Sequence, residues 1–226
     1  TQRGNVSSRR QKSVKVKTAR GRTNSSTRWL QRQLNDPYVA AAKAEGYRSR
    51  AAFKIIELDE KFRFFKKGMK VVDLGAAPGG WSQIASQRMG KNGKIVAIDL
   101  LPIDPISGAE ILEMDFLDDE APEIMKEKLG GKADLVMSDM APSTTGHKGT
   151  DHLRIIGLAE VAAHFAKEIL ASNGTFVCKL FQGGETKDLI ADLKKCFKQV
   201  RHAKPAASRS DSSETFLVAT GFKGEG

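Results

Sequence analysis

The chain has few cysteines, no long hydrophobic run and, in its first 35 residues, no acidic side chain. The two cysteines, Cys178 and Cys196, cannot build a disulfide framework, and their apolar surroundings favour reduced thiols in a core. No segment approaches the roughly 18 consecutive apolar residues of a membrane-spanning helix, so we expect no membrane association. The four histidines and two cysteines lack the spacing of metal ligands, so we expect no metal site.

The positive charge is unevenly distributed. The chain has 226 residues and a formal net charge of +10, and ten of its 37 Lys and Arg lie within residues 1–35, where Asp and Glu are absent. Residues 36–226 then carry equal numbers of basic and acidic side chains. We therefore expect a basic, disordered tail over 1–35 and one folded domain over 36–226. Such a tail would attract RNA phosphates; a solubilising tail or an organelle transit peptide are alternatives.

The hydrophobic pattern after residue 36 predicts an α/β fold. Strands and helices alternate, which indicates a Rossmann-like, mostly parallel sheet with helices on both faces and a closing antiparallel hairpin. Seven strands are expected, over residues 70–73, 94–99, 110–114, 133–139, 174–179, 199–204 and 214–220. Helices are expected over residues 39–45, 48–65, 80–89, 121–128, 153–171 and 185–197.

The most informative segment is residues 71–81, VVDLGAAPGGW. A short apolar strand runs into a glycine-rich turn and a helix, an arrangement that places a nucleotide-like ligand at the carboxyl end of a parallel strand. Ala77 stands where a dinucleotide fingerprint needs its second glycine, and no Gly-Lys-Ser/Thr follows. A nucleoside with little or no phosphate, such as S-adenosylmethionine, therefore fits better than NAD or ATP. Asp73, Gly75, Pro78, Gly79 and Trp81 of this segment are candidate ligand contacts.

Four acids follow four successive predicted strands: Asp73, Asp99, Asp115 and Asp139. Functional residues of doubly wound sheets lie at these strand ends. Asp99 stands where a ribose-binding carboxylate is expected, and Asp115 could accept from an adenine amino group. Each acid alone could equally be a helix cap or a turn residue, but the four together favour a ligand site.

Three further charged residues are candidates for chemistry. Lys179 interrupts an apolar run, where desolvating its charge is costly. It could reach water from an edge position, or be held in the cleft beside Asp139. Lys54 on an apolar helix and Glu214 at a strand start are, taken alone, ordinary surface residues. Lys43, Arg48 and Arg50 lie near Lys54 and could face an RNA backbone.

These residues stand within a set of motifs that resembles the FtsJ/RrmJ-type 2′-O-ribose methyltransferases. The resemblance covers about residues 36–222 and depends on the combination of several segments. They are 36–38 (DPY), 42–43 (AK), 46–54 (GYRSRAAFK), 72–83 (VDLGAAPGGWSQ), 99–102 (DLLP), 115–116 (DF), 137–142 (MSDMAP), 179–182 (KLFQ) and 212–214 (SSE).

The resemblance implies an S-adenosylmethionine-dependent methyltransferase that modifies a uridine ribose of large-subunit ribosomal RNA, on the assembled subunit. By motif match, the catalytic residues would be Lys54, Asp139, Lys179 and Glu214. It assigns cofactor contacts to Gly79, Trp81, Asp99, Asp115 and Asp139. We expect a cytoplasmic monomer, with an organelle as the other compartment.

Two other kinds of RNA methyl transfer fit the sequence less well. Adenine amino methylation usually needs an Asp/Asn-Pro-Pro-aromatic loop, but Ser143 follows Pro142 here. Cytosine C5 methylation needs a nucleophilic cysteine in a loop, whereas Cys178 lies inside a predicted strand. A non-catalytic RNA-binding or ribosome-assembly factor, and a 2′-O-methyltransferase acting on another RNA such as tRNA, remain as alternatives.

Overall fold

The computed structural model describes residue 15 and residues 24–142, 148–181 and 186–224. One seven-stranded sheet forms the centre, in the order β3-β2-β1-β4-β5-β7-β6. Its strands are β1 (Lys70–Leu74), β2 (Lys94–Asp99), β3 (Ala109–Glu113), β4 (Ala133–Ser138), β5 (Leu170–Phe181), β6 (Phe197–Ala203) and β7 (Glu214–Phe222). Strands β1 to β5 pair in parallel, and β7 pairs antiparallel with both β5 and β6. The predicted α/β fold with a C-terminal antiparallel pair is confirmed.

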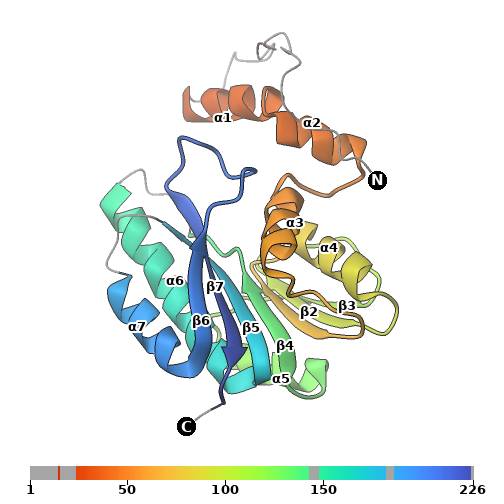
Figure 1. Cartoon of the computed structure of the whole chain (residues 1–226). Helices are drawn as coiled ribbons and strands as arrows, with labels where there is room; N and C mark the ends of the chain where they lie inside the picture. Colours follow the sequence, from red (N-terminus) through yellow and green to blue (C-terminus); the bar gives the residue numbers. More distant parts are fainter. Residues whose placement is uncertain (1–14, 16–23, 143–147, 182–185, 225–226) are drawn as a thin grey trace.

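Helices cover both faces of this sheet (Figure 1). Helices α3 (Ala51–Phe62) and α4 (Gly80–Met89) pack on one face. Helices α5 (Ala121–Leu129), α6 (Lys148–Ile169) and α7 (Lys187–Cys196) pack on the other. Because successive strand residues point to opposite faces, Val71 enters the first core and Val72 the second. Central strands buried on both sides need continuous apolar sequence, as β1 and β4 have.

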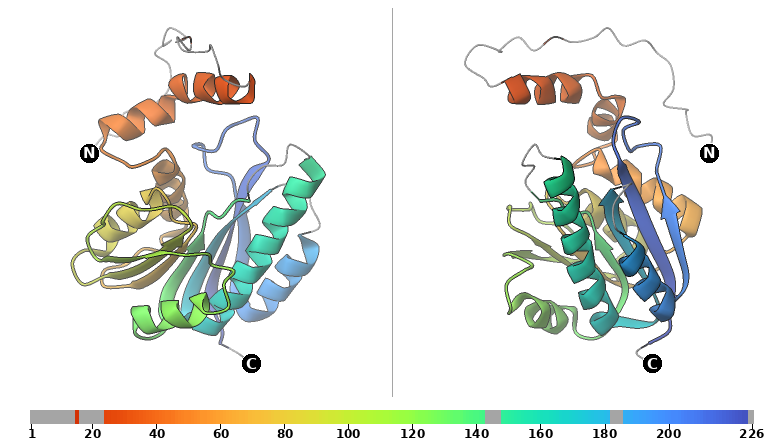
Figure 2. Two further views of the ribbon diagram at one scale, coloured as in Figure 1. Left: turned by 180° about the vertical axis from the view of Figure 1, so that it is seen from behind. Right: turned by 90° about the vertical axis from the view of Figure 1, so that its left-hand side faces the viewer.

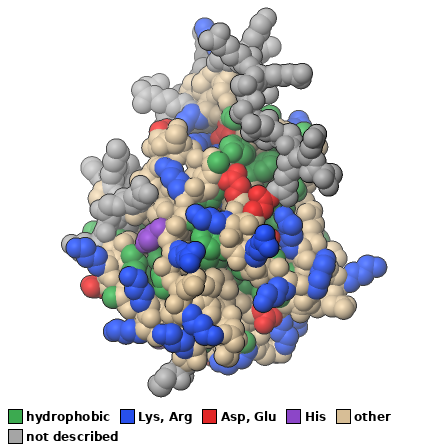
Figure 3. All heavy atoms as spheres, viewed as in Figure 1, with side chains coloured by type: hydrophobic (Ala, Val, Ile, Leu, Met, Phe, Trp, Pro, Cys, Tyr) green, Lys and Arg blue, Asp and Glu red, His purple; other side chains and the backbone are tan. Residues whose placement is uncertain are grey.

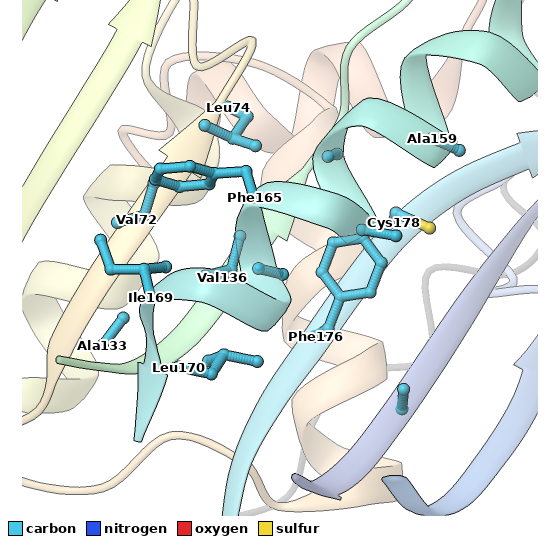
Figure 4. Close-up of a cluster of buried hydrophobic side chains, with 14 of the residues drawn as sticks. Val72, Leu74, Ala133, Val136, Ala159, Phe165, Ile169, Leu170, Phe176 and Cys178 are labelled. Carbon is cyan, nitrogen blue, oxygen red and sulfur yellow. The ribbon is translucent and has the colours of Figure 1, made fainter. Parts of the chain in front are cut away.

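The core between α6 and the sheet contains large aromatic and aliphatic side chains (Figure 4). Phe165 and Ile169 of α6 lie beside Val72, Val136 and Phe176 of three neighbouring strands. Cys178 belongs to this core, and burial raises the pKa of its thiol to about 12. The expectation of a core cysteine is confirmed for Cys178, whereas Cys196 is only partly buried.

Helices α1 (Asn24–Leu34) and α2 (Pro37–Ala44) form an arm above the carboxyl ends of the parallel strands (Figures 1 and 2). The sequence predicted no regular structure before residue 36, so α1 is a correction for residues 24–34. Leu30 and Leu34 stand four residues apart on one helical face, a pattern that the polar composition of the whole tail conceals. The other tail residues, apart from Lys15 and Asn35, lie outside the described part of the chain.

None of the helices in the described residues combines the length and the apolar character of a membrane-spanning segment.

Phe176 provides a test of the core. Its side chain is fully buried, so Phe176→Ala should lower the free energy of unfolding by about 3–5 kcal/mol through lost burial and a residual cavity. Denaturant unfolding measures this loss. Leu101→Ala, at a side chain that is 63% exposed, is the control and should change stability by less than about 0.5 kcal/mol. Equal losses in the two variants would contradict this core assignment.

Candidate active site

A cavity of about 690 Å³ opens at the carboxyl ends of β1, β2 and β4. Gly75, Asp99, Asp115 and Asp139 are among the residues that line it, together with an apolar wall. That wall includes Ile98, Leu100, Leu101, Met114, Phe116, Leu117, Met140, Leu158 and Val161. A mostly apolar cavity with a few polar groups is typical of small-molecule sites, and its size suits a nucleoside-containing ligand.

The glycine turn after β1 forms one side of the cavity. Gly75 has φ +72°, and a Cβ atom there would lie 2.7 Å from Cγ and 2.9 Å from Cα of Met140. Its backbone amide donates to the carbonyl of Ile98 at 3.0 Å, which ties the turn to β2. Only glycine combines this conformation with this close approach to Met140, and both residues line the cavity.

Asp99 and Asp115 both shape turns and face the cavity. The Asp99 carboxylate accepts from the amides of Ala77 and Leu101, each at 2.9 Å. Asp115 accepts from the amide of Leu117 at 2.9 Å. The turn interpretation and the ligand interpretation are therefore compatible, because a carboxylate has about four acceptor positions.

Other predicted contacts are not among the described residues that line this cavity: Asp73, Pro78, Gly79 and Trp81. The Trp81 indole donates to the carbonyl of Ala51 at 2.9 Å and its ring lies 5.7 Å from that of Phe216, inside the core. Gly79, at φ +99°, precedes α4, and Pro78 is exposed. Pro78, Gly79 and Trp81 therefore support the glycine turn from the side away from the cavity.

Asp73 is fully buried beneath the glycine turn. One carboxylate oxygen accepts from the Ser82 hydroxyl at 2.6 Å, whereas Oδ1 has no hydrogen-bond partner among the described residues. Burial, with smaller contributions from Asp139 and Asp99, raises the pKa of Asp73 to about 7. A hydrogen-bond donor or a positive charge near this end of the sheet would therefore stabilise the ionised form of Asp73.

Lys179 and Asp139 form a pair at the cavity wall. The Lys179 amine donates to Oδ1 of Asp139 at 3.0 Å and to its backbone oxygen at 2.6 Å. The Lys179 side chain is only 8% exposed, so it does not reach out to water. Burial alone would raise the pKa of Asp139, but the positive charges of Lys179 and Lys54 and the hydrogen bond from Lys179 hold it below its usual range.

Lys54 and Glu214 form a second pair beside the first. The Lys54 amine lies 2.8 Å from Oε2 of Glu214 and 5.6 Å from the ring centre of Phe216. Because β7 runs antiparallel to β5, Phe216 stands opposite Lys179 and Glu214 opposite Phe181. Lys54 is buried, so an ordinary surface position is wrong for it. The structure thus brings the four predicted catalytic side chains into one neighbourhood.

The structure also shows contacts that the sequence did not predict. Ser208 donates to Oε1 of Glu214 at 2.7 Å. Arg48 donates to the carbonyls of Asp104 and Pro105, each at 2.7 Å, and so holds a loop beside the turn rather than facing outward. The apolar wall could have been found in the sequence, because several of its residues directly follow the acids at the strand ends.

In the described residues, no group of three or more His, Cys, Asp or Glu is arranged to hold a metal ion.

The raised pKa of Asp73 predicts a pH-dependent stability. Between its ordinary value of 3.8 and about 7, the folded chain keeps the proton that the unfolded chain loses, so this group lowers stability as pH rises through that window. As the pH rises from 4 to 8, the free energy of unfolding of Asp73→Asn should therefore increase by about 2–4 kcal/mol relative to that of the parent protein.

Denaturant unfolding across that range, with the exposed Asp118→Asn as the control for a lost carboxylate, provides the measurement. A constant difference between Asp73→Asn and the parent protein would show that Asp73 is ionised in the folded chain at all these pH values.

Comparison with known proteins agrees with this geometry. The family model of FtsJ-like methyltransferases matches residues 47–222. A protein of Xanthobacter autotrophicus named ribosomal RNA large subunit methyltransferase E is 64% identical over 215 residues, covering 94% of this chain and 85% of the relative. A protein of Gluconobacter oxydans with the same name is 58% identical, covering 96% and 80%.

A solved structure supports the same relationship. It is described as a candidate ribosomal RNA methyltransferase of Plasmodium falciparum, and it is 35% identical with a TM-score of 0.71. The match covers 79% of this chain and all of that one. Motifs, fold and relatives coincide over the same residues, and the chain belongs to the FtsJ-like methyltransferase family.

Proposed function

We propose that this chain transfers a methyl group from S-adenosylmethionine to the ribose 2′-hydroxyl of a uridine in large-subunit ribosomal RNA. The observation that carries the proposal is the pair of buried lysine–carboxylate contacts beside a nucleoside-sized cavity, in a chain 64% identical to a large-subunit RNA methyltransferase. The proposal includes the assembled large subunit as substrate, a monomeric enzyme and a bacterial cytoplasmic location. No observation favours a non-catalytic assembly factor or a tRNA substrate.

The cavity fits S-adenosylmethionine, which supplies a methyl group on a positively charged sulfur when bound. Three carboxylates, those of Asp99, Asp115 and Asp139, line the cavity, and they suit a cation. Asp99 would accept from ribose hydroxyls and Asp115 from an adenine amino group, while the apolar wall would cover the base. Asp73, Gly75, Pro78, Gly79 and Trp81 would hold the turn and its backbone in place.

Lys179 would take or steer the proton that the ribose hydroxyl loses. A hydroxyl is a weak nucleophile that needs a base within hydrogen-bond reach. An ammonium has three donor positions, and Asp139 occupies two of those on Lys179. The remaining position carries the lone pair when the amine is neutral, so the two hydrogen bonds to Asp139 would orient this lone pair toward the ribose hydroxyl. Lys54, held by Glu214, would orient the hydroxyl next to it.

Lys179→Ala tests the role of this amine. With undermethylated large subunits and labelled S-adenosylmethionine, the parent protein should place label on a uridine 2′-oxygen. The variant should lose activity by about 100-fold or more, because a general base contributes that much, while its affinity for S-adenosylmethionine stays within about twofold. Nuclease digestion and nucleoside analysis locate the label.

Lys132→Ala is a suitable control for this experiment, because Lys132 is an exposed lysine outside the site. Near-parental turnover by Lys179→Ala would remove this lysine from the mechanism. Absence of label from the parent protein on subunits and free ribosomal RNA, despite cofactor binding, would contradict the proposed substrate.

The basic tail would strengthen RNA binding through phosphate contacts. On the face that includes β6, Lys and Arg side chains are scattered among other residues (Figure 3), so we assign the RNA contact to the tail and not to this face. Replacing the eight Lys and Arg of residues 3–22 by Gln should weaken RNA binding and flatten its salt dependence, because fewer counterions are released. Affinity for S-adenosylmethionine should not change. Binding titrations at several salt concentrations measure the slope, and an unchanged slope would exclude the tail from RNA contact.

A further inference from the structure

One buried carboxylate, that of Asp36, joins three segments that are far apart in the sequence. Its Oδ1 accepts from the Tyr38 amide at 3.0 Å and so caps α2. Its Oδ2 lies 3.0 Å from Nε of Arg50, which precedes α3, and 3.1 Å from Nη2 of Arg209, in the loop between β6 and β7. Capping a helix requires only one oxygen, so the second oxygen serves a different purpose.

The contacts continue from this carboxylate to the Lys54–Glu214 pair. Arg50 donates to the carbonyl of Ala207 at 2.5 Å, which fixes the same loop that carries Arg209. The next residue, Ser208, donates to Glu214 at 2.7 Å, and Glu214 holds Lys54. An unbroken series of short contacts therefore connects the arm of α1 and α2 with the proposed catalytic residues.

The connection depends on the opposite charges of Asp36 and its two arginine partners. Two guanidinium groups share one carboxylate that is only 8% exposed, and burial lowers the pKa of Arg50 despite the proximity of Asp36. Removing a partner from a buried ion pair leaves an uncompensated charge, which is strongly unfavourable. Loss of either arginine contact should therefore destabilise this position of the arm.

We propose that Asp36 and Arg209 are positioning residues, which hold the arm over the Lys54–Glu214 pair so that bound RNA presents its target ribose there. This inference rests on the proposed function for the identity of the RNA. The arm offers exposed basic side chains, Arg32 and Lys43, to a phosphate backbone. Phosphate contacts set the register of a nucleic acid on a protein, so the placement of the arm would decide which ribose reaches the site.

Substitutions in the 226-residue chain distinguish the effect of the Asp36 charge from the effect of its helix cap. Asn caps a helix about as well as Asp, so Asp36→Asn keeps the α2 cap and removes the charge. Arg209→Ala removes the contact from the loop side, and Arg209→Lys restores a positive charge. Arg201→Ala is the matched control, because Arg201 is an exposed arginine on neighbouring β6 and its loss changes the net charge equally.

Steady-state methylation of large subunits and hydrogen exchange of the free protein are the two readouts. Asp36→Asn and Arg209→Ala should each lower kcat/KM for RNA by about tenfold, mainly through KM, and leave the affinity for S-adenosylmethionine unchanged. Amides of α1 and α2 should exchange faster, with the sheet unaffected. The double variant should be no worse than either single one, and Arg209→Lys should recover part of the loss.

Several outcomes would overturn the inference. One is a kcat/KM for Arg209→Ala equal to that of Arg201→Ala. Another is a parallel loss of sheet protection or of S-adenosylmethionine affinity, which would indicate a general structural role. If the parent protein fails to methylate the RNA, the proposed function fails instead. Hydrogen exchange then still decides whether Asp36 and Arg209 hold the arm, since unchanged exchange in α1 and α2 would refute it.

Discussion

Two lysine amines are buried at the carboxyl ends of the strands, and each is stable there because a carboxylate lies within 3.0 Å. A buried charge without a partner costs several kcal/mol, so the positions of Asp139 and Glu214 are as constrained as those of Lys179 and Lys54. The two pairs depend on the register between β5 and β7, on the packing of α3 against the sheet and on the position of the end of β4. The proposed catalytic residues therefore also neutralise one another's charges at this end of the fold.

The carboxylates in and behind the cavity beside these pairs are not fully neutralised by other groups in the described part of the protein. Asp99 and Asp115 accept hydrogen bonds from turn amides, but one oxygen of Asp73 has no hydrogen-bond partner among the described residues, and burial raises the pKa of Asp73 to about 7. Carboxylates gathered at one edge of a sheet repel one another and lower the stability of the fold. A positively charged ligand would relieve that repulsion, which is consistent with a sulfonium cofactor and with a cavity whose remaining surface is apolar.

Pairing of acidic and basic side chains also connects the arm of α1 and α2 to the rest of the fold. Asp36, Arg50 and Arg209 continue the alternation of acidic and basic side chains that begins at Lys179, and they connect the basic N-terminal region to the site through ion pairs and short hydrogen bonds. RNA recognition and chemistry would then be coupled by contacts between charged side chains and not by the sheet. The sheet and its two hydrophobic cores serve as the rigid base for both.

The sequence alone determined the family, the α/β fold, the glycine turn and the four acids at strand ends, because these depend on local patterns: residue period, glycine at positive φ, and apolar runs that end in a polar residue. It predicted Lys54 and Glu214 only through resemblance, since their own neighbourhoods are typical of surface residues. Tertiary structure decided that they are paired, because antiparallel pairing of β7 with β5 and the packing of α3 join residues 160 positions apart. It also decided that Asp73 and Trp81 lie behind the cavity, that α1 is helical, and that Asp36 faces two arginines. Contacts at such separations follow from packing and charge pairing in three dimensions, which no local pattern records.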